Sequence, residues 1–103
     1  MISSRKIIES PVGQAETEAY AYEIDTSDYE SYTPSNPTCF IFVDDVDKSS
    51  IHLSGTATIT STTILTTKLV SGLKKNKRYR LVIEWDDSGN HLSTFCEIIG
   101  EKQ

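Results

Sequence analysis

The chain has 103 residues, 37% of them hydrophobic, and a formal net charge of −5, which suits one domain with its own core. The acidic balance argues against nucleic acid as a partner, because phosphate binding needs a basic face. No apolar stretch approaches the roughly 18 residues of a membrane helix. No apolar segment follows the two basic residues near the N-terminus. We therefore expect no signal peptide, no membrane contact and a cytoplasmic location.

Alternation of apolar and polar side chains dominates the chain, and helical periodicity is nearly absent. This pattern predicts short β-strands bounded by turn residues. We expect about seven strands, drawn from residues 5–10, 18–25, 38–43, 51–54, 56–69 (two short strands broken near 61–62), 79–85 and 91–99. Residues 1–4 and 100–103 are expected to fray at the ends of a single domain spanning 1–103.

Two segments between the early strands lack apolar periodicity. Residues 26–37 contain two prolines and predict a loop, and residues 44–50 predict a polar turn. Between them, the continuous apolar run at 38–43 is too short for a helix and predicts a strand that is buried on both faces.

The segment at 79–85 is the strongest strand signal. Tyr79, Leu81, Ile83 and Trp85 share one face of it. A hairpin turn is expected directly afterwards, where Gly89 can supply the positive φ that such turns need.

A leucine and a tyrosine before this strand carry a resemblance to known domains. Leu73 lies six residues before Tyr79, which opens the strand. This spacing resembles the tyrosine corner of immunoglobulin-like and fibronectin type III domains, where the phenol hydroxyl bonds a backbone group upstream. The resemblance implies an all-β, immunoglobulin-like antiparallel β-sandwich. Antibody-type marks are missing, because Leu81 stands where the second cysteine would lie and no Trp follows Cys39.

A looser resemblance extends over most of the chain. Ser10 and Pro11 precede Glu16 at the start, a proline-rich loop precedes the third expected strand, and Tyr-Arg-Leu-Val-Ile follows Leu73 near the end. This arrangement is similar to that of small immunoglobulin-like proteins encoded by prophages and tailed viruses. It implies a virion-associated structural accessory protein.

No pattern of catalytic or metal-ligating residues emerges. Cys39 and Cys96 lie within expected strands and outside any C-x-x-C pair, so we expect free, buried and inert thiols, although the sequence leaves open whether they approach each other. His52 and His91 lie near strand ends, where we expect surface histidines without a spacing partner. We expect no enzyme, no cofactor and no small-molecule substrate.

Two acidic turns leave one alternative open. Their side chains are Asp44, Asp45 and Asp47 in one turn, and Asp86, Asp87 and Asn90 in the other. Neither turn matches the twelve-residue EF-hand loop, so solvated carboxylates are expected, with calcium binding as the alternative.

In an immunoglobulin-like sandwich, the second–third and sixth–seventh strand loops meet at one end. We take this end as the candidate interaction surface because tyrosines and acidic side chains suit protein recognition. The candidate residues are Asp25, Asp28, Tyr29, Glu30, Tyr32, Trp85, Asp86 and Asp87. We expect this end to be purely acidic.

The opposite end is expected to be basic but partly neutralised. The basic residues there are Lys74, Lys75, Lys77 and Arg78. The acidic residues expected to offset them are Glu16, Glu18, Asp44, Asp45 and Asp47.

These expectations lead to a non-catalytic binding or assembly module, with a protein partner or self-association. The acidic end would dock on a basic protein, or oppositely charged ends would stack head to tail. The alternative is a cytoplasmic adaptor or inhibitor that captures a host protein through the acidic, tyrosine-bearing loops.

Overall fold

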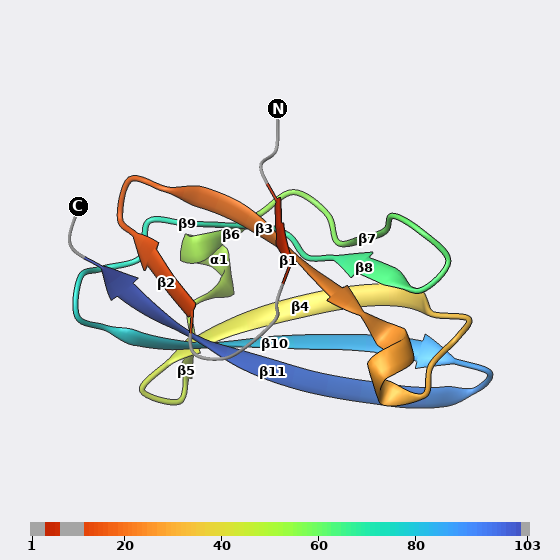
Figure 1. The fold of residues 1–103 in the computed structure, drawn as a ribbon. Helices are drawn as coiled ribbons and strands as arrows, with labels where there is room; N and C mark the ends of the chain where they lie inside the picture. Colours follow the sequence, from red (N-terminus) through yellow and green to blue (C-terminus); the bar gives the residue numbers. More distant parts are fainter. Residues whose placement is uncertain (1–3, 7–11, 102–103) are drawn as a thin grey trace.

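Two β-sheets packed against each other form the molecule (Figure 1). The computed structural model describes residues 4–6 and 12–101. Short helical turns, η1 (Thr26–Tyr29) and α1 (Ser49–His52), interrupt the strands. No helix among these residues has the length and apolar character to cross a membrane.

The first sheet is built from short strands around β3. Its order is β6-β9-β3-β8-β7, and β1 pairs with β3 in parallel. The strands are β1 (Ser4–Lys6), β3 (Ala19–Asp25), β6 (Leu53–Ser54), β7 (Thr58–Ile59), β8 (Ile64–Thr66) and β9 (Leu69–Ser71).

The second sheet contains the long strands that run the length of the molecule in Figure 1. Its order is β2-β11-β10-β4-β5, and β2 pairs with β11 in parallel. The strands are β2 (Val12–Ala15), β4 (Ser35–Val43), β5 (Val46–Asp47), β10 (Arg78–Asp87) and β11 (Asn90–Glu101).

The predicted all-β sandwich is confirmed, but the strands are shorter and more numerous than about seven. The predicted break in the threonine-rich segment separates β7 from β8. A further break separates β8 from β9, because the Thr67 hydroxyl accepts the backbone N–H of Tyr22 at 2.9 Å. The sheets are also not purely antiparallel, since the N-terminal segment adds one parallel strand to each sheet.

Some predicted boundaries are wrong. Residues 51–54 divide between α1 and β6, residues 26–37 include η1 and the start of β4, and Gly100 and Glu101 belong to β11 instead of a frayed tail. Of the predicted first strand, residues 7–10 lie outside the described residues, as does the Ser10-Pro11 motif.

The core lies between the sheets. Tyr22, Ile24, Leu65 and Val70 contribute to it from the first sheet. The second sheet contributes Cys39, Ile41, Tyr79, Leu81, Ile83, Trp85, Cys96 and Ile98. The predicted inward face of 79–85 is confirmed, because all four of its side chains are at most 2% exposed.

Two-residue loops close the hairpins of the second sheet. Asp44 and Asp45 have φ of 52° and 62°, and Ser88 and Gly89 have φ of 52° and 87°. Positive φ at both central residues twists the chain in the sense that antiparallel strands require. The hairpin predicted around Gly89 is therefore confirmed.

Candidate functional site

The loop end, defined here as residues 26–34 together with 86–91, brings the two predicted loops together. Asp87 holds them: its carboxylate accepts the backbone N–H of Tyr32 at 3.1 Å and the hydroxyl of Thr33. The Thr33 bond is the main reason that the pKa of Asp87 is lowered. This carboxylate is therefore used to fix the loop on the hairpin.

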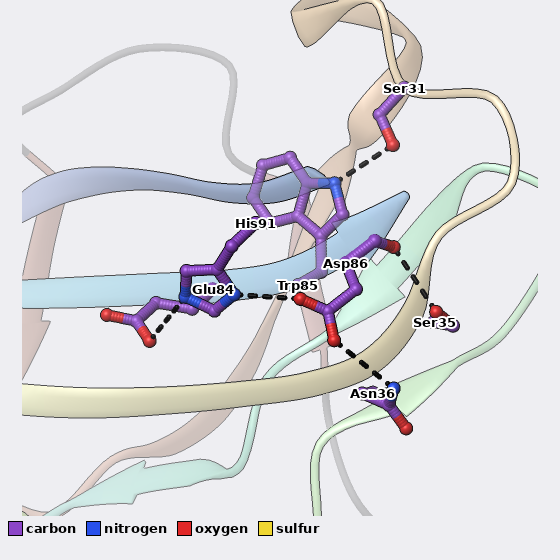
Figure 2. A network of polar contacts seen from close by, with 7 residues as sticks. All are labelled: Ser31, Ser35, Asn36, Glu84, Trp85, Asp86 and His91. Carbon is purple, nitrogen blue, oxygen red and sulfur yellow. Dashed lines mark hydrogen bonds and ion pairs between the residues drawn. The ribbon is translucent and has the colours of Figure 1, made fainter. Parts of the chain in front are cut away.

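Asp86 is tied to its neighbours in a similar way. Its carboxylate accepts the side-chain N–H of Asn36 at 3.2 Å and lies 2.8 Å from Nδ1 of His91. Figure 2 shows the imidazole between the carboxylates of Asp86 and Glu84, and Nε2 lies 3.2 Å from Glu84. His91 lies at the surface, as expected, and strand pairing places it on the same face as these two carboxylates.

His91 adds a basic side chain to the loop end. Carboxylates accept hydrogen bonds and do not donate them, so two carboxylates facing both ring nitrogens favour the imidazolium form. The bonds to Asp86 and then Glu84 raise the pKa of His91. The His91 bond likewise is the main cause of a lowered pKa at Asp86. The loop end is therefore not purely acidic.

Trp85 is not part of an interaction surface. It is fully buried, and its indole N–H donates to the Ser31 hydroxyl at 2.9 Å (Figure 2). Tyr29 packs edge-on against it with ring centroids 5.7 Å apart. Trp85 shares the buried face of its strand with Tyr79, Leu81 and Ile83. Its side chain therefore enters the core, although the residue lies next to the turn.

The other predicted loop residues have mixed roles. Asp25 caps η1, because its carboxylate accepts the Ser27 N–H at 3.0 Å. Asp28 and Glu30 are exposed, as are the side chains of Tyr29 and Tyr32, at 45% and 60%. The loop end thus presents two tyrosines and two carboxylates to solvent.

The opposite end contains the predicted tyrosine corner. The backbone N–H of Lys74 donates to the hydroxyl of Tyr79 at 2.8 Å, and Leu73 is fully buried beside it. Within the predicted set, Lys74 pairs with Glu16 at 3.1 Å, while Asp45 pairs at 3.6 Å with Arg80, a basic residue outside that set.

Both cysteines are free and buried, as expected. Burial raises the pKa of Cys96 to about 12 and also raises that of Cys39. A thiol with a raised pKa is a poor nucleophile at neutral pH. His52, expected at the surface, is buried instead: Nδ1 lies 3.1 Å from the Ser71 carbonyl, and its ring packs edge-on against Tyr79.

The acidic turns do not assemble a set of ligands. Within residues 4–6 and 12–101, no three His, Cys, Asp or Glu side chains are grouped so that they could hold a metal ion. Asp47 accepts the backbone N–H and the hydroxyl of Ser49, which lowers its pKa.

One surface was missed. The outer face, defined here as the outward side chains of β4, β10 and β11, carries all three phenylalanines of the chain, namely Phe40, Phe42 and Phe95. Phe95 is 59% exposed, while Phe40 and Phe42 are half-buried. The strand at 38–43 was predicted to be buried on both faces, and this is wrong for its outer face.

Aromatic and charged groups meet on the outer face. The guanidinium of Arg80 lies 5.4 Å from the ring centroid of Phe42. Two open depressions lie on this face. The residues that line one of them are Phe40, Phe42, Arg80, Val82, Glu84, Ser93, Thr94 and Phe95. No sequence signal marked this face, because residues 39–42 are all apolar, and only the structure shows that Phe40 and Phe42 alternate with the buried Cys39 and Ile41.

No family model and no curated protein matches this chain. The loop end and the outer face differ in which of their side chains remain free to contact another molecule. The carboxylates of Asp86 and Asp87 in the loop end, and of Asp25 beside it, accept hydrogen bonds from within the molecule. The outer face instead leaves its largest apolar side chains partly in contact with water.

Proposed function

We propose that this protein is a non-catalytic binding or assembly module that contacts another protein through the outer face. The placement of all three phenylalanines there carries the proposal. Phe95 is 59% exposed, although it is a large apolar side chain. Clustered apolar groups with a polar surround are typical of protein interfaces.

The geometry of the outer face suits binding. The strands pair in regular register around the three phenylalanines, and the register shift between Glu84 and Asp86 on the β4 side lies beyond them, so the aromatic groups sit on an ordered platform. Little ordering of the backbone is then needed on association. Burying one phenylalanine contributes roughly 1.5–3 kcal/mol, and such anchors carry most of the energy of an interface.

The resemblance to small prophage and tailed-virus proteins favours an assembly role within this proposal. The second candidate function is capture of a host protein by the loop end. The exposures of Tyr32 at 60% and Tyr29 at 45% favour it, since tyrosine gives a large contact area with few rotatable bonds.

A photo-crosslinking amino acid in place of Phe95 tests the proposal in cells that naturally produce the protein. Position 32 reports on the loop end, and position 60, exposed beyond β7, is the matched control. We expect a discrete crosslinked product from position 95 and none from position 60. No product at position 95, or a product at position 32 alone, would overturn binding through the outer face.

A further inference from the structure

The outward side chains of β10 follow a symmetric order of charge. They are Arg78, Arg80, Val82, Glu84 and Asp86, while the side chains between them enter the core. The strand therefore reads positive, positive, apolar, negative, negative about Val82. Such a strand is complementary to itself when a second copy runs in the opposite direction.

The neighbouring strands place the apolar groups at the centre of this pattern. Val82 is directly opposite Phe40 on β4 and Phe95 on β11. Phe42 lies beside Arg80, one step toward the basic end. The charges thus flank an apolar middle on the outer face.

We infer that the outer face binds a second copy of this chain. The two-fold axis of this dimer lies between the two faces, passes over Val82 and runs across the strands at right angles to β10. This inference rests on the proposed function and names its partner. Arg80 of one copy then faces Glu84 of the other, Arg78 faces Asp86, and Phe40 and Phe95 meet their own counterparts. A two-fold interface requires such reciprocal contacts.

The opposite choice of axis is disfavoured by the same charges. An axis along β10 would place Arg80 against Arg80 and Glu84 against Glu84. Like charges brought together at an interface are unfavourable, so the charges on β10 favour the antiparallel arrangement.

Each of these charged groups already has a partner within its own copy, and these pairs are open to solvent. Arg80 pairs with Asp45 at 3.6 Å, and the Asp45 side chain is 90% exposed. Arg78 pairs with Glu97, and His91 lies between Glu84 and Asp86. Exposed pairs contribute little in water. Asp45 and Glu97 partly offset the two arginines of β10, and His91 partly offsets its two carboxylates. The apolar middle of the outer face therefore supplies most of the affinity, and the charges on β10 determine the orientation of the second copy.

Sedimentation velocity of the full chain, with charge-reversed variants, tests the inference. We expect the wild type to form a concentration-dependent dimer. Arg80→Glu and Glu84→Arg should each raise its dissociation constant at least about tenfold, because each sets like charges against each other across the interface. The double variant R80E/E84R restores both attractions and should return to the wild-type dimer.

Two further variants complete the experiment. Phe95→Ser should weaken the dimer without changing the fold measured by circular dichroism, and Lys75→Glu, at the exposed opposite end, should leave it unchanged. A wild type that stays monomeric at high concentration overturns the inference, as does a dimer that ignores both charge reversals. If position 95 then crosslinks to a different protein, the proposed function stands and the second copy does not.

Discussion

At the scale of single residues, His91 shows how two neighbouring carboxylates favour the protonated form of a histidine. Its two ring nitrogens lie 2.8 Å from Asp86 and 3.2 Å from Glu84, and these bonds raise its pKa above the ordinary value of 6.5. The raised pKa means that folding favours the protonated form. Its contribution to stability is present in full below 6.5 and is lost as the pH rises through the folded value.

An NMR titration of His91 checks this account. We expect a pKa above 6.5 in the wild type and a fall toward 6.5 in Asp86→Asn, because Asp86 is the larger cause of the shift. Asp28→Asn, which removes another exposed carboxylate of the loop end, is the control and should leave the titration unchanged. His91→Gln should lower the free energy of unfolding more at about pH 5.5 than at about pH 8.5. Equal losses at both pH values would contradict the charged pairing.

At the scale of elements, the tyrosine corner fixes the start of β10 against the turn before it. The Tyr79 ring is buried, and its hydroxyl accepts the Lys74 N–H at 2.8 Å. The same turn meets β11, where the Asn76 N–H donates to the Gly100 carbonyl at 2.9 Å. A Cβ at Gly100 would lie 1.8 Å from the Lys74 carbonyl oxygen, so this close approach requires glycine.

Removal of one oxygen atom tests the corner. Tyr79→Phe keeps the ring in the core but leaves the Lys74 N–H without its acceptor. We expect the free energy of unfolding to fall by about 1–2 kcal/mol in urea. Tyr32→Phe, at an exposed ring, is the matched control and should change stability by less than about 0.5 kcal/mol. Equal effects of the two substitutions would show that the corner adds nothing.

At the scale of the whole molecule, Gln14 joins the two sheets. It lies on β2 of the second sheet, is fully buried, and donates to the Val70 carbonyl on β9 at 2.9 Å. Its side-chain oxygen accepts the Tyr22 hydroxyl on β3 at 2.6 Å. Satisfied buried polar groups of this kind favour one arrangement of the layers.

Gln14→Leu keeps most of the volume and removes these bonds. We expect a loss of about 2–4 kcal/mol in the free energy of unfolding, because the Val70 carbonyl and the Tyr22 hydroxyl lose their bonds to this side chain. Adding Tyr22→Phe should then cost less than it does in the wild type, as a double-mutant cycle measures. Simple additivity of the two losses would argue against the bond between the sheets.

The strand pattern, the hairpin at Gly89 and the tyrosine corner were predictable because they depend on residues near one another in sequence. The burial of Trp85 was harder to predict, because two local patterns disagreed. Its position in the alternation placed it on the buried face, and its position next to a turn suggested an exposed loop residue. His52 and Gln14 were not predictable, since their burial depends on strands that lie far away along the chain.

The sequence by itself determined the alternation of side chains, and with it the all-β class and the inward face of β10. It also contained the ordered charges from Arg78 to Asp86. Only the tertiary structure decided which apolar groups reach solvent, because strand pairing placed Phe40, Val82 and Phe95 side by side on the outside of a sheet. Burial is a property of what packs over a face, and no local pattern specifies that.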